Sequence, residues 1–170
     1  MAEIKRVYWD SCMWIALIGE EVGRVERCDA LIQQAKNGEL EIWTSSLTLA
    51  EVYKFKCGAD LKQLAQEKDQ AFEMFLQQPY VVQIQLDHSV GVHARRLLRA
   101  HSPPLKKPND AIHVASAAAG NVQALYTFDS QNLIPLSGLV QRADGGSLAI
   151  CEPPTPQFAQ QPDMFDKKPS

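Results

Sequence analysis

Paired cysteines are missing from this sequence. Its four cysteines lie far apart in the chain, at positions 12, 28, 57 and 151. Without a CxxC pair they do not suit an ordinary zinc site, and their low density excludes a disulfide scaffold. We therefore expect reduced, mostly packed thiols. Cys12 could be accessible to solvent, but we expect it to be buried at the start of a helix.

Long apolar runs and an excess of positive charge are also missing. No apolar stretch approaches the length of a membrane span, and the N-terminus lacks a basic region followed by an apolar core. This pattern argues against a transmembrane helix and a signal peptide, and predicts a cytoplasmic protein. The formal net charge is only -3, so binding to nucleic acid or to a membrane would need a local basic patch.

Alternating strand-like and helix-like segments fill most of the chain. With 170 residues and 45% hydrophobic content, it can form one domain with a sizeable core. Strands are expected at residues 4–9, 40–43, 80–86, 124–128 and 147–151, the third of them at a sheet edge. Helices are expected at residues 12–19, 22–36 and 61–77, around Glu51 after a cap at Ser45 or Ser46, from Asp87 or Ser89 to Ser102, and from Asp110. The alternation predicts an α/β domain with a mainly parallel central sheet and helices on both faces.

The composition changes after residue 151. Proline, glutamine and aspartate dominate residues 152–170, whereas the regular elements lie in residues 1–151. We expect one domain over residues 1–151, followed by a flexible tail that has no core of its own. Phe158, Met164 and Phe165 are the sizeable apolar groups of this tail, and they could dock on the domain or on a partner.

Four acidic residues are placed in a similar way relative to the expected elements. Asp10 ends the first strand, Glu51 lies in the helix after the second, Asp110 opens a helix, and Asp129 ends the fourth strand. The carboxyl ends of parallel strands line one crevice, so these residues should converge. Four carboxylates repel each other, and such a cluster persists only with a hard cation such as Mg2+ or Mn2+. Taken singly, Asp110 could instead stabilise a helix start, and Glu51 could be an ordinary exposed helix acid.

The order of four motifs carries a family resemblance. Asp10-Ser11 follows the first strand, Glu51 lies in a Ser-x-x-x-x-Glu-Val-Tyr segment, residues 109–117 read Asn-Asp-Ala-Ile-His-Val-Ala-Ser-Ala, and Thr127-Phe128-Asp129 closes a late strand. This ordered set, from about Val7 to about Leu133, resembles the PIN-domain ribonucleases, and the tail has no place in the family pattern. The resemblance implies a three-layer α/β/α domain whose carboxylates bind one or two divalent ions and cut RNA phosphodiesters.

The resemblance also implies roles for single residues. It places Asp10, Glu51, Asp110 and Asp129 at the family's metal site, and it matches Thr127 to a hydroxyl residue beside the last acid. Physical chemistry supports this role for the acids, because a divalent ion activates water near neutral pH and stabilises charge on phosphate oxygens. We expect Asp10 and Asp110 to be direct ligands. Glu51 and Asp129 could bind the ion directly or through water, or act as a general base.

The polar residues near these acids have more than one interpretation. Ser11 could hydrogen-bond a water on the metal or cap the following helix. Asn109 is expected to form a turn, and His113 is expected to be a core or supporting histidine rather than a ligand. One basic segment could contact RNA phosphates or could be a solvated helix face; it comprises Arg95, Arg96, Arg99, His101, Lys106 and Lys107. Lys54 and Lys56, near Glu51, could extend this patch.

Several functions remain open at this point. Small single-domain PIN proteins mostly resemble the toxin half of bacterial type II (virulence-associated) toxin-antitoxin modules, which implies a small antitoxin as partner and a homodimer. A stand-alone RNA-processing nuclease would carry the same motifs. A catalytically inactive PIN-like module that binds proteins has no need to collect mutually repelling carboxylates. A haloacid-dehalogenase-like phosphatase would need an acid where Cys12 stands, and a receiver domain would need a lysine that closes a final strand.

Overall fold

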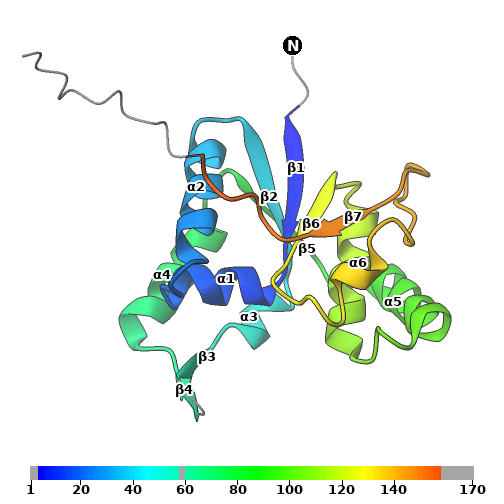
Figure 1. Ribbon diagram of the computed structural model, residues 1–170, viewed down its shortest axis with the longest axis horizontal. Helices are drawn as coiled ribbons and strands as arrows, with labels where there is room; N and C mark the ends of the chain where they lie inside the picture. Colours follow the sequence, from blue (N-terminus) through cyan, green and yellow to red (C-terminus); the bar gives the residue numbers. More distant parts are fainter. Residues whose placement is uncertain (1–3, 58–59, 158–170) are drawn as a thin grey trace, which may run out of the picture.

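Five parallel strands form the central sheet of the computed structural model, which describes residues 4–57 and 60–157 (Figure 1). In spatial order they are β5 (Val81–Ile84), β2 (Leu40–Ser45), β1 (Lys5–Trp9), β6 (Ala124–Tyr126) and β7 (Ala149–Cys151). Every neighbouring pair is parallel. The predicted parallel sheet is therefore confirmed, with β1 at its centre and β5 at an edge, as the pattern of residues 80–86 predicts.

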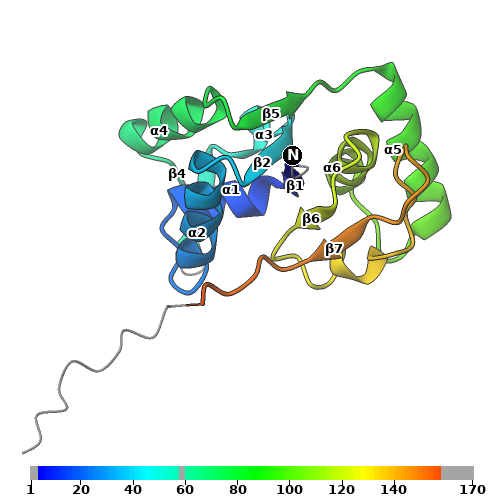
Figure 2. The ribbon, with the colours of Figure 1, turned by 90° about the horizontal axis from the view of Figure 1, so that it is seen from above.

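Helices cover both faces of this sheet (Figures 1 and 2). On one face lie α1 (Ser11–Ile18), α2 (Val25–Lys36) and α4 (Gln66–Leu76), and on the other lie α5 (His88–His101) and α6 (Pro108–Ala119). Successive residues of a strand point to opposite faces, so each face of the sheet has its own core. This arrangement is the three-layer α/β/α fold that the sequence predicts.

The two cores differ in the size of their side chains. On the α1 side, Trp9, Trp14 and Phe72 pack together, with ring centroids 4.8 Å apart for the two tryptophans and 5.7 Å apart for Trp14 and Phe72. On the other face, Tyr8 packs against the alanine-rich α6. Short alanine side chains let a helix lie close to a sheet, and the first turn of α6 therefore lies beside the end of β1.

The helix predicted at residues 61–77 is shorter in the structure. It begins only at Gln66, as α4. The preceding segment is a strand, β4 (Asp60–Gln63), which pairs antiparallel with β3 (Lys54–Cys57). The β3 segment alternates lysine with less polar residues, which is the two-residue period of a strand. This local pairing overrides the helical pattern at the start of the predicted helix.

The helix predicted at residues 22–36 also begins later than expected, at Val25. Gly23 has a φ of 78°, in the left-handed region that a right-handed helix cannot include. Val22 lies before this turn and is 94% exposed. The apolar character of Val22 therefore has no part in the helical stripe of α2.

The helix expected around Glu51 is a single turn, α3 (Thr48–Glu51). Its first residue is preceded by Leu47, which provides no side-chain cap. The Ser45 hydroxyl accepts a hydrogen bond from the Leu47 N–H at 3.1 Å. The serine therefore turns the chain before α3 instead of capping it, and neither of the two expected serine caps is present.

The chain beyond β6 returns to the sheet through a short helical turn, η1 (Ile134–Leu136), and then β7. Residues 152–157 have no regular secondary structure, and an ion pair of 2.8 Å between Arg27 and Glu152 ties them to α2. Residues 158–170, which include the three apolar groups of the expected tail, lie outside the described residues. None of the helices in the described part of the chain has the length and apolar character to cross a membrane.

Candidate active site

Four acidic side chains border one cavity at the carboxyl ends of the central strands. Asp10 follows β1 directly, Asp129 follows β6 after Thr127 and Phe128, Glu51 ends α3, and Asp110 lies in the first turn of α6. The cavity has a volume of about 640 Å³. The structure therefore brings together all four acids that the sequence singles out, although their surroundings differ.

Asp10 is the most buried of the four acids, with 4% of its surface exposed. Its Oδ1 accepts hydrogen bonds from the Met13 N–H at 3.2 Å, which caps α1, and from the Cys12 thiol at 2.9 Å. Its Oδ2 accepts from the Thr127 hydroxyl at 2.5 Å. Burial raises the pKa of Asp10, and the nearby His113 and the hydrogen-bond donors offset this effect only in part. Ionised Asp10 is therefore costly to bury, and a nearby cation would relieve that cost.

Cys12 borders the cavity and is only half-buried, so the expectation of a fully buried cysteine is wrong. Its thiol donates to Asp10, and its sulfur accepts from the Phe128 N–H at 3.2 Å. Burial and the Asp10 carboxylate raise the pKa of this thiol well above its ordinary value. Cys12 therefore stays protonated and acts as a hydrogen-bond donor, not as a thiolate.

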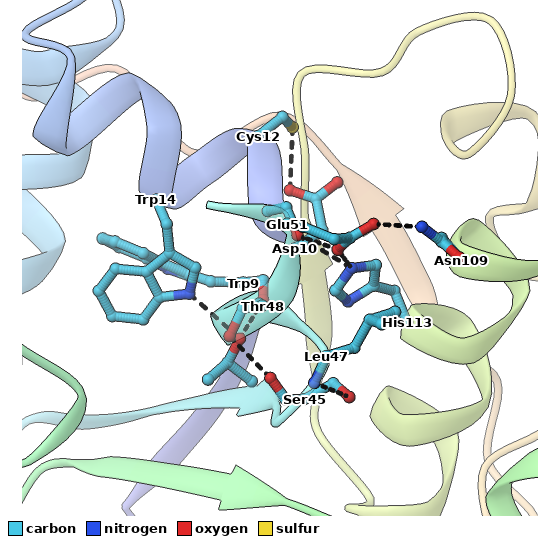
Figure 3. Close-up of polar contacts among 12 residues, drawn as sticks. Trp9, Asp10, Cys12, Trp14, Ser45, Leu47, Thr48, Glu51, Asn109 and His113 are labelled. Carbon is cyan, nitrogen blue, oxygen red and sulfur yellow. Dashed lines mark hydrogen bonds and ion pairs between the residues drawn. The ribbon is translucent and has the colours of Figure 1, made fainter. Parts of the chain in front are cut away.

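Glu51 receives hydrogen bonds from two helices, and Figure 3 shows its contacts with Asn109 and His113 of α6. Asn109 of α6 donates to its Oε1 at 2.9 Å, His113 Nε2 lies 2.7 Å from its Oε2, and the Ser11 hydroxyl of α1 donates to the same oxygen. Burial by itself would raise the pKa of Glu51. The hydrogen bond and the electrostatic effect of His113 lower it, as do the hydrogen bonds from Ser11 and Asn109, and together they outweigh burial, so the pKa of Glu51 is lowered. Glu51 is therefore ionised near neutral pH. Ser11 contacts this acid and leaves the capping of α1 to Asp10.

His113 connects Glu51 to the core. It is 2% exposed, and its Nδ1 lies 2.8 Å from the Tyr8 hydroxyl. The Glu51 carboxylate can only accept, so His113 Nε2 carries a hydrogen toward it, and Nδ1 pairs with the Tyr8 hydroxyl. Burial raises the pKa of Tyr8 well above its ordinary value, which keeps this hydroxyl protonated. His113 is thus a buried supporting histidine, as the sequence suggests, but its link to Tyr8 is not visible in the sequence pattern.

Asp129 and Asp110 complete the acidic cavity. Asp129 Oδ1 accepts from the backbone N–H groups of Gln131 and Asn132, at 3.1 and 2.9 Å. Asp110 differs, because its Oδ2 is buried and has no hydrogen-bond partner among the described residues. Burial raises the pKa of Asp110; Lys107 opposes this rise and the Asp129 charge adds to it. Among the four acids, Asp110 is therefore the one with a buried carboxylate oxygen that no described residue hydrogen-bonds.

Residues 7–133, more than half of the chain, match the family model described as PIN domain. The chain belongs to the PIN-domain family. PIN domains are typically nucleases. All four acids of the cavity lie within the matched residues.

Solved structures similar to this PIN domain include a toxin and toxin-antitoxin complexes. VapC20 of Mycobacterium tuberculosis, described as a sarcin-ricin loop cleaving toxin, is 17% identical, with a TM-score of 0.56 over 72% of this chain and 89% of its own. A toxin-antitoxin complex from Klebsiella pneumoniae is 19% identical, with a TM-score of 0.53 over 74% and 88%. VapBC2 from Rickettsia felis, bound to a promoter DNA fragment, is 20% identical, with a TM-score of 0.50 over 71% and 86%. At these identities the likeness shows a shared fold. No match was found among curated proteins.

The predicted basic segment divides into two groups on the PIN domain. Arg95, Arg96 and Arg99 are exposed on α5, which lies on the outer side of α6 (Figure 2), and they do not border the acidic cavity. Arg96 instead borders a second cavity of about 470 Å³. Lys107 borders the acidic cavity together with Lys54, whereas Lys106 does not. The structure therefore places two lysines, and none of the three arginines, beside the acids.

The acidic side chains of the PIN domain are candidate ligands for a metal ion. Among the residues that the structure describes, no group of three or more histidine, cysteine, aspartate or glutamate side chains is arranged so that it could hold a metal ion. PIN domains usually bind a divalent metal. The cavity offers carboxylate oxygens, one of them buried and unpartnered on Asp110. In chemical type these oxygen donors suit a hard cation such as Mg2+ or Mn2+, although the side chains that the structure describes do not surround a common point.

Proposed function

We propose that this PIN domain is a divalent-metal-dependent endoribonuclease that acts at the acidic cavity. The observation that carries the proposal is the unpartnered, buried oxygen of Asp110, on a cavity that three further acids border. A buried carboxylate oxygen without a donor is costly unless a cation or a donor approaches it. A divalent ion would meet this need, and membership of a typically nucleolytic family supports the same chemistry.

The side chains of the cavity have distinct roles in this proposal. Asp10 and Asp110 would hold the ion directly, and Glu51 and Asp129 would bind it directly or through water. When bound, the ion would activate water and stabilise charge on the phosphate oxygens. Hydrogen bonds from Thr127 to Asp10, and from Ser11, Asn109 and His113 to Glu51, fix the directions of these two carboxylates. Lys54 and Lys107, from separate elements that border the cavity, would contact RNA phosphates.

Removal of the divalent ion is expected to stop RNA cleavage. Purified protein should convert total cellular RNA into discrete products with Mg2+ or Mn2+, and should give none with excess chelator. Asp110→Asn removes a ligand charge at nearly constant shape, so it should weaken Mn2+ binding in calorimetry at least about tenfold. Asp144→Asn, at an exposed loop acid that pairs with Arg142, is the matched control and should bind Mn2+ normally.

A wild-type protein that cleaves no RNA with either ion and binds no Mn2+ would contradict the proposal. The protein-binding module would then be the better description. Cleavage that continues in excess chelator would contradict the metal dependence alone.

Loss of the Tyr8 hydroxyl is expected to weaken catalysis without unfolding the protein. Tyr8→Phe removes the hydrogen bond to His113 Nδ1 and so loosens the ring that holds Glu51. We expect kcat on a defined RNA to fall about tenfold with little change in KM, as for other residues that orient a metal ligand. Tyr126→Phe removes a hydroxyl that lies 3.2 Å from Lys5 Nζ, away from the cavity, and serves as the control. An unchanged kcat in Tyr8→Phe would show that Glu51 does not depend on this contact.

The setting that we propose for this activity is a toxin-antitoxin pair. The similar solved structures include a toxin and toxin-antitoxin complexes, which supports an antitoxin as a partner. We further propose that this antitoxin is a small protein that covers the cavity and that the toxin is a homodimer. The same cavity would serve a stand-alone RNA-processing nuclease equally well. Growth arrest on expression, relieved by a neighbouring gene, would distinguish the toxin from the processing enzyme.

A further inference from the structure

Three of the side chains that line the acidic cavity are apolar or aromatic. Ile15 of α1, Ala50 of α3 and Tyr53, directly after α3, border the cavity beside the carboxylates. Ala50 and Tyr53 are exposed, and Ile15 is half-buried. Binding an ion and a phosphate group requires only charged and polar contacts, so the proposed chemistry leaves these three side chains without a role.

The position of Tyr53 is fixed by its backbone, although its ring is 46% exposed. Val52, the residue before it, is buried in the core on the α1 side. The Tyr53 carbonyl accepts from the Leu64 N–H at 2.8 Å, which closes the base of the β3–β4 hairpin. Tyr53 therefore presents an aromatic surface at the cavity from a constrained position, separated from Glu51 by Val52 alone.

Positive charge lies over one face of this ring. The Nζ atom of Lys54 is 4.9 Å from the centroid of the Tyr53 ring, and Lys54 also borders the cavity. An aromatic surface next to a cationic group matches a nucleotide, which combines a flat base with a phosphate. An apolar protein segment bound here would have no anionic group to pair with Lys54.

We infer that Tyr53, Ile15 and Ala50 form a subsite for one unpaired nucleobase of the RNA, next to the phosphate that the acidic cavity receives. This inference rests on the proposed nuclease function. A base inside an A-form duplex is stacked and paired and cannot reach a side chain in this way, whereas an unpaired base can stack on an aromatic ring. Because every base has a flat face, the subsite selects for the unpaired state more than for the identity of the base.

The test is RNA binding by full-length protein in the Asp10→Asn background, where no cleavage should occur. Fluorescence anisotropy would compare a uridine 12-mer with a strand of equal length made of abasic sites. Tyr53→Leu, which keeps apolar bulk but removes the ring, should weaken binding of the uridine strand about 5- to 150-fold, the range expected for one stacked base. It should leave binding of the abasic strand unchanged, and Tyr53→Phe should restore the affinity that Tyr53→Leu loses.

Tyr80→Leu is the matched control, because Tyr80 is half-buried beside α4 and does not border the acidic cavity. Equal weakening on both strands, or no weakening on either, would overturn the inference. Binding is measured without cleavage, so the two proposals can fail separately. If the wild type cleaves RNA but Tyr53→Leu shows no strand-dependent loss, only the subsite is wrong. If the loss is present but the wild type is inert, only the nuclease function is wrong.

Discussion

Replacing Asp10 with asparagine is expected to abolish RNA cleavage while the fold persists. The substitution removes the charge of a proposed direct ligand, and the loss of several kcal/mol of charge stabilisation at the phosphate corresponds to a fall in kcat of about 10³-fold or more. Asparagine is also a good N-cap, so the bond from the Met13 N–H can remain. Burial raises the pKa of Asp10, which means that its charge is not what holds the metal-free fold together.

Asp87 offers a matched control for this prediction. It caps α5 in the way that Asp10 caps α1, accepting from the Val90 N–H at 2.9 Å, but it does not border the acidic cavity. Asp87→Asn makes the same chemical change at the same kind of helix position and should cleave RNA at the wild-type rate. Cleavage assays and metal-free thermal unfolding of both variants check the prediction. More than about a tenth of the wild-type kcat in Asp10→Asn would exclude an essential ligand role.

Replacing Trp14 with alanine is expected to cause a large loss of stability. Trp14 is fully buried, packs against Trp9 and Phe72, and donates its indole N–H to Thr44 Oγ1 at 3.1 Å. Truncating a buried tryptophan costs about 3–5 kcal/mol, against a total of about 5–15 kcal/mol for a domain of ordinary stability. Urea unfolding followed by circular dichroism in the presence of chelator would measure the change in the free energy of unfolding.

Trp43→Ala provides the comparison from β2, where the side chain packs on the other face of the sheet. Trp43 is only partly buried, donates to Glu41 at 3.0 Å, and has the Arg6 guanidinium 5.2 Å from its ring centroid. Trp43→Ala should lower the free energy of unfolding clearly less than Trp14→Ala does, because less apolar surface is returned to water. Equal losses for the two variants would show that the tryptophan cluster on the α1 side is not the main source of stability in that layer.

The convergence of the acids could be predicted from the sequence because it depends on little detail. Asp10 and Asp129 lie just past two strands, and the carboxyl ends of parallel strands meet whatever the length of chain between them. The position of Asp110 could be predicted for a similar reason, because a carboxylate in the first turn of a helix lies at the N-terminal end of that helix. The five strands of the central sheet and the two helical layers could be predicted from the period of the hydrophobic residues. The pairing of β3 with β4 could not.

Contacts that depend on how a helix is rotated and shifted could not be predicted. The sequence shows that Arg95, Arg96 and Arg99 are off the buried stripe of α5, but not toward which side of the molecule they point. The link between Tyr8 and His113 depends on the position of α6 along β1, which no local pattern encodes. Its one signal was that a tyrosine and a histidine stood in segments expected to be buried, where each polar group needs a partner.

The junction between α3 and the β3–β4 hairpin is a place where related proteins can differ in sequence and length. Glu51 and Tyr53 flank Val52 at this junction, and the hairpin forms a separate two-stranded sheet that projects from the domain (Figure 1). Asp10, Asp110 and Asp129 depend on β1, α6 and β6 instead. Insertions and deletions in a hairpin are tolerated better than changes in the central strands. Descendants of one ancestral gene could therefore come to recognise different RNAs through this short segment while they inherit the other three carboxylates unchanged.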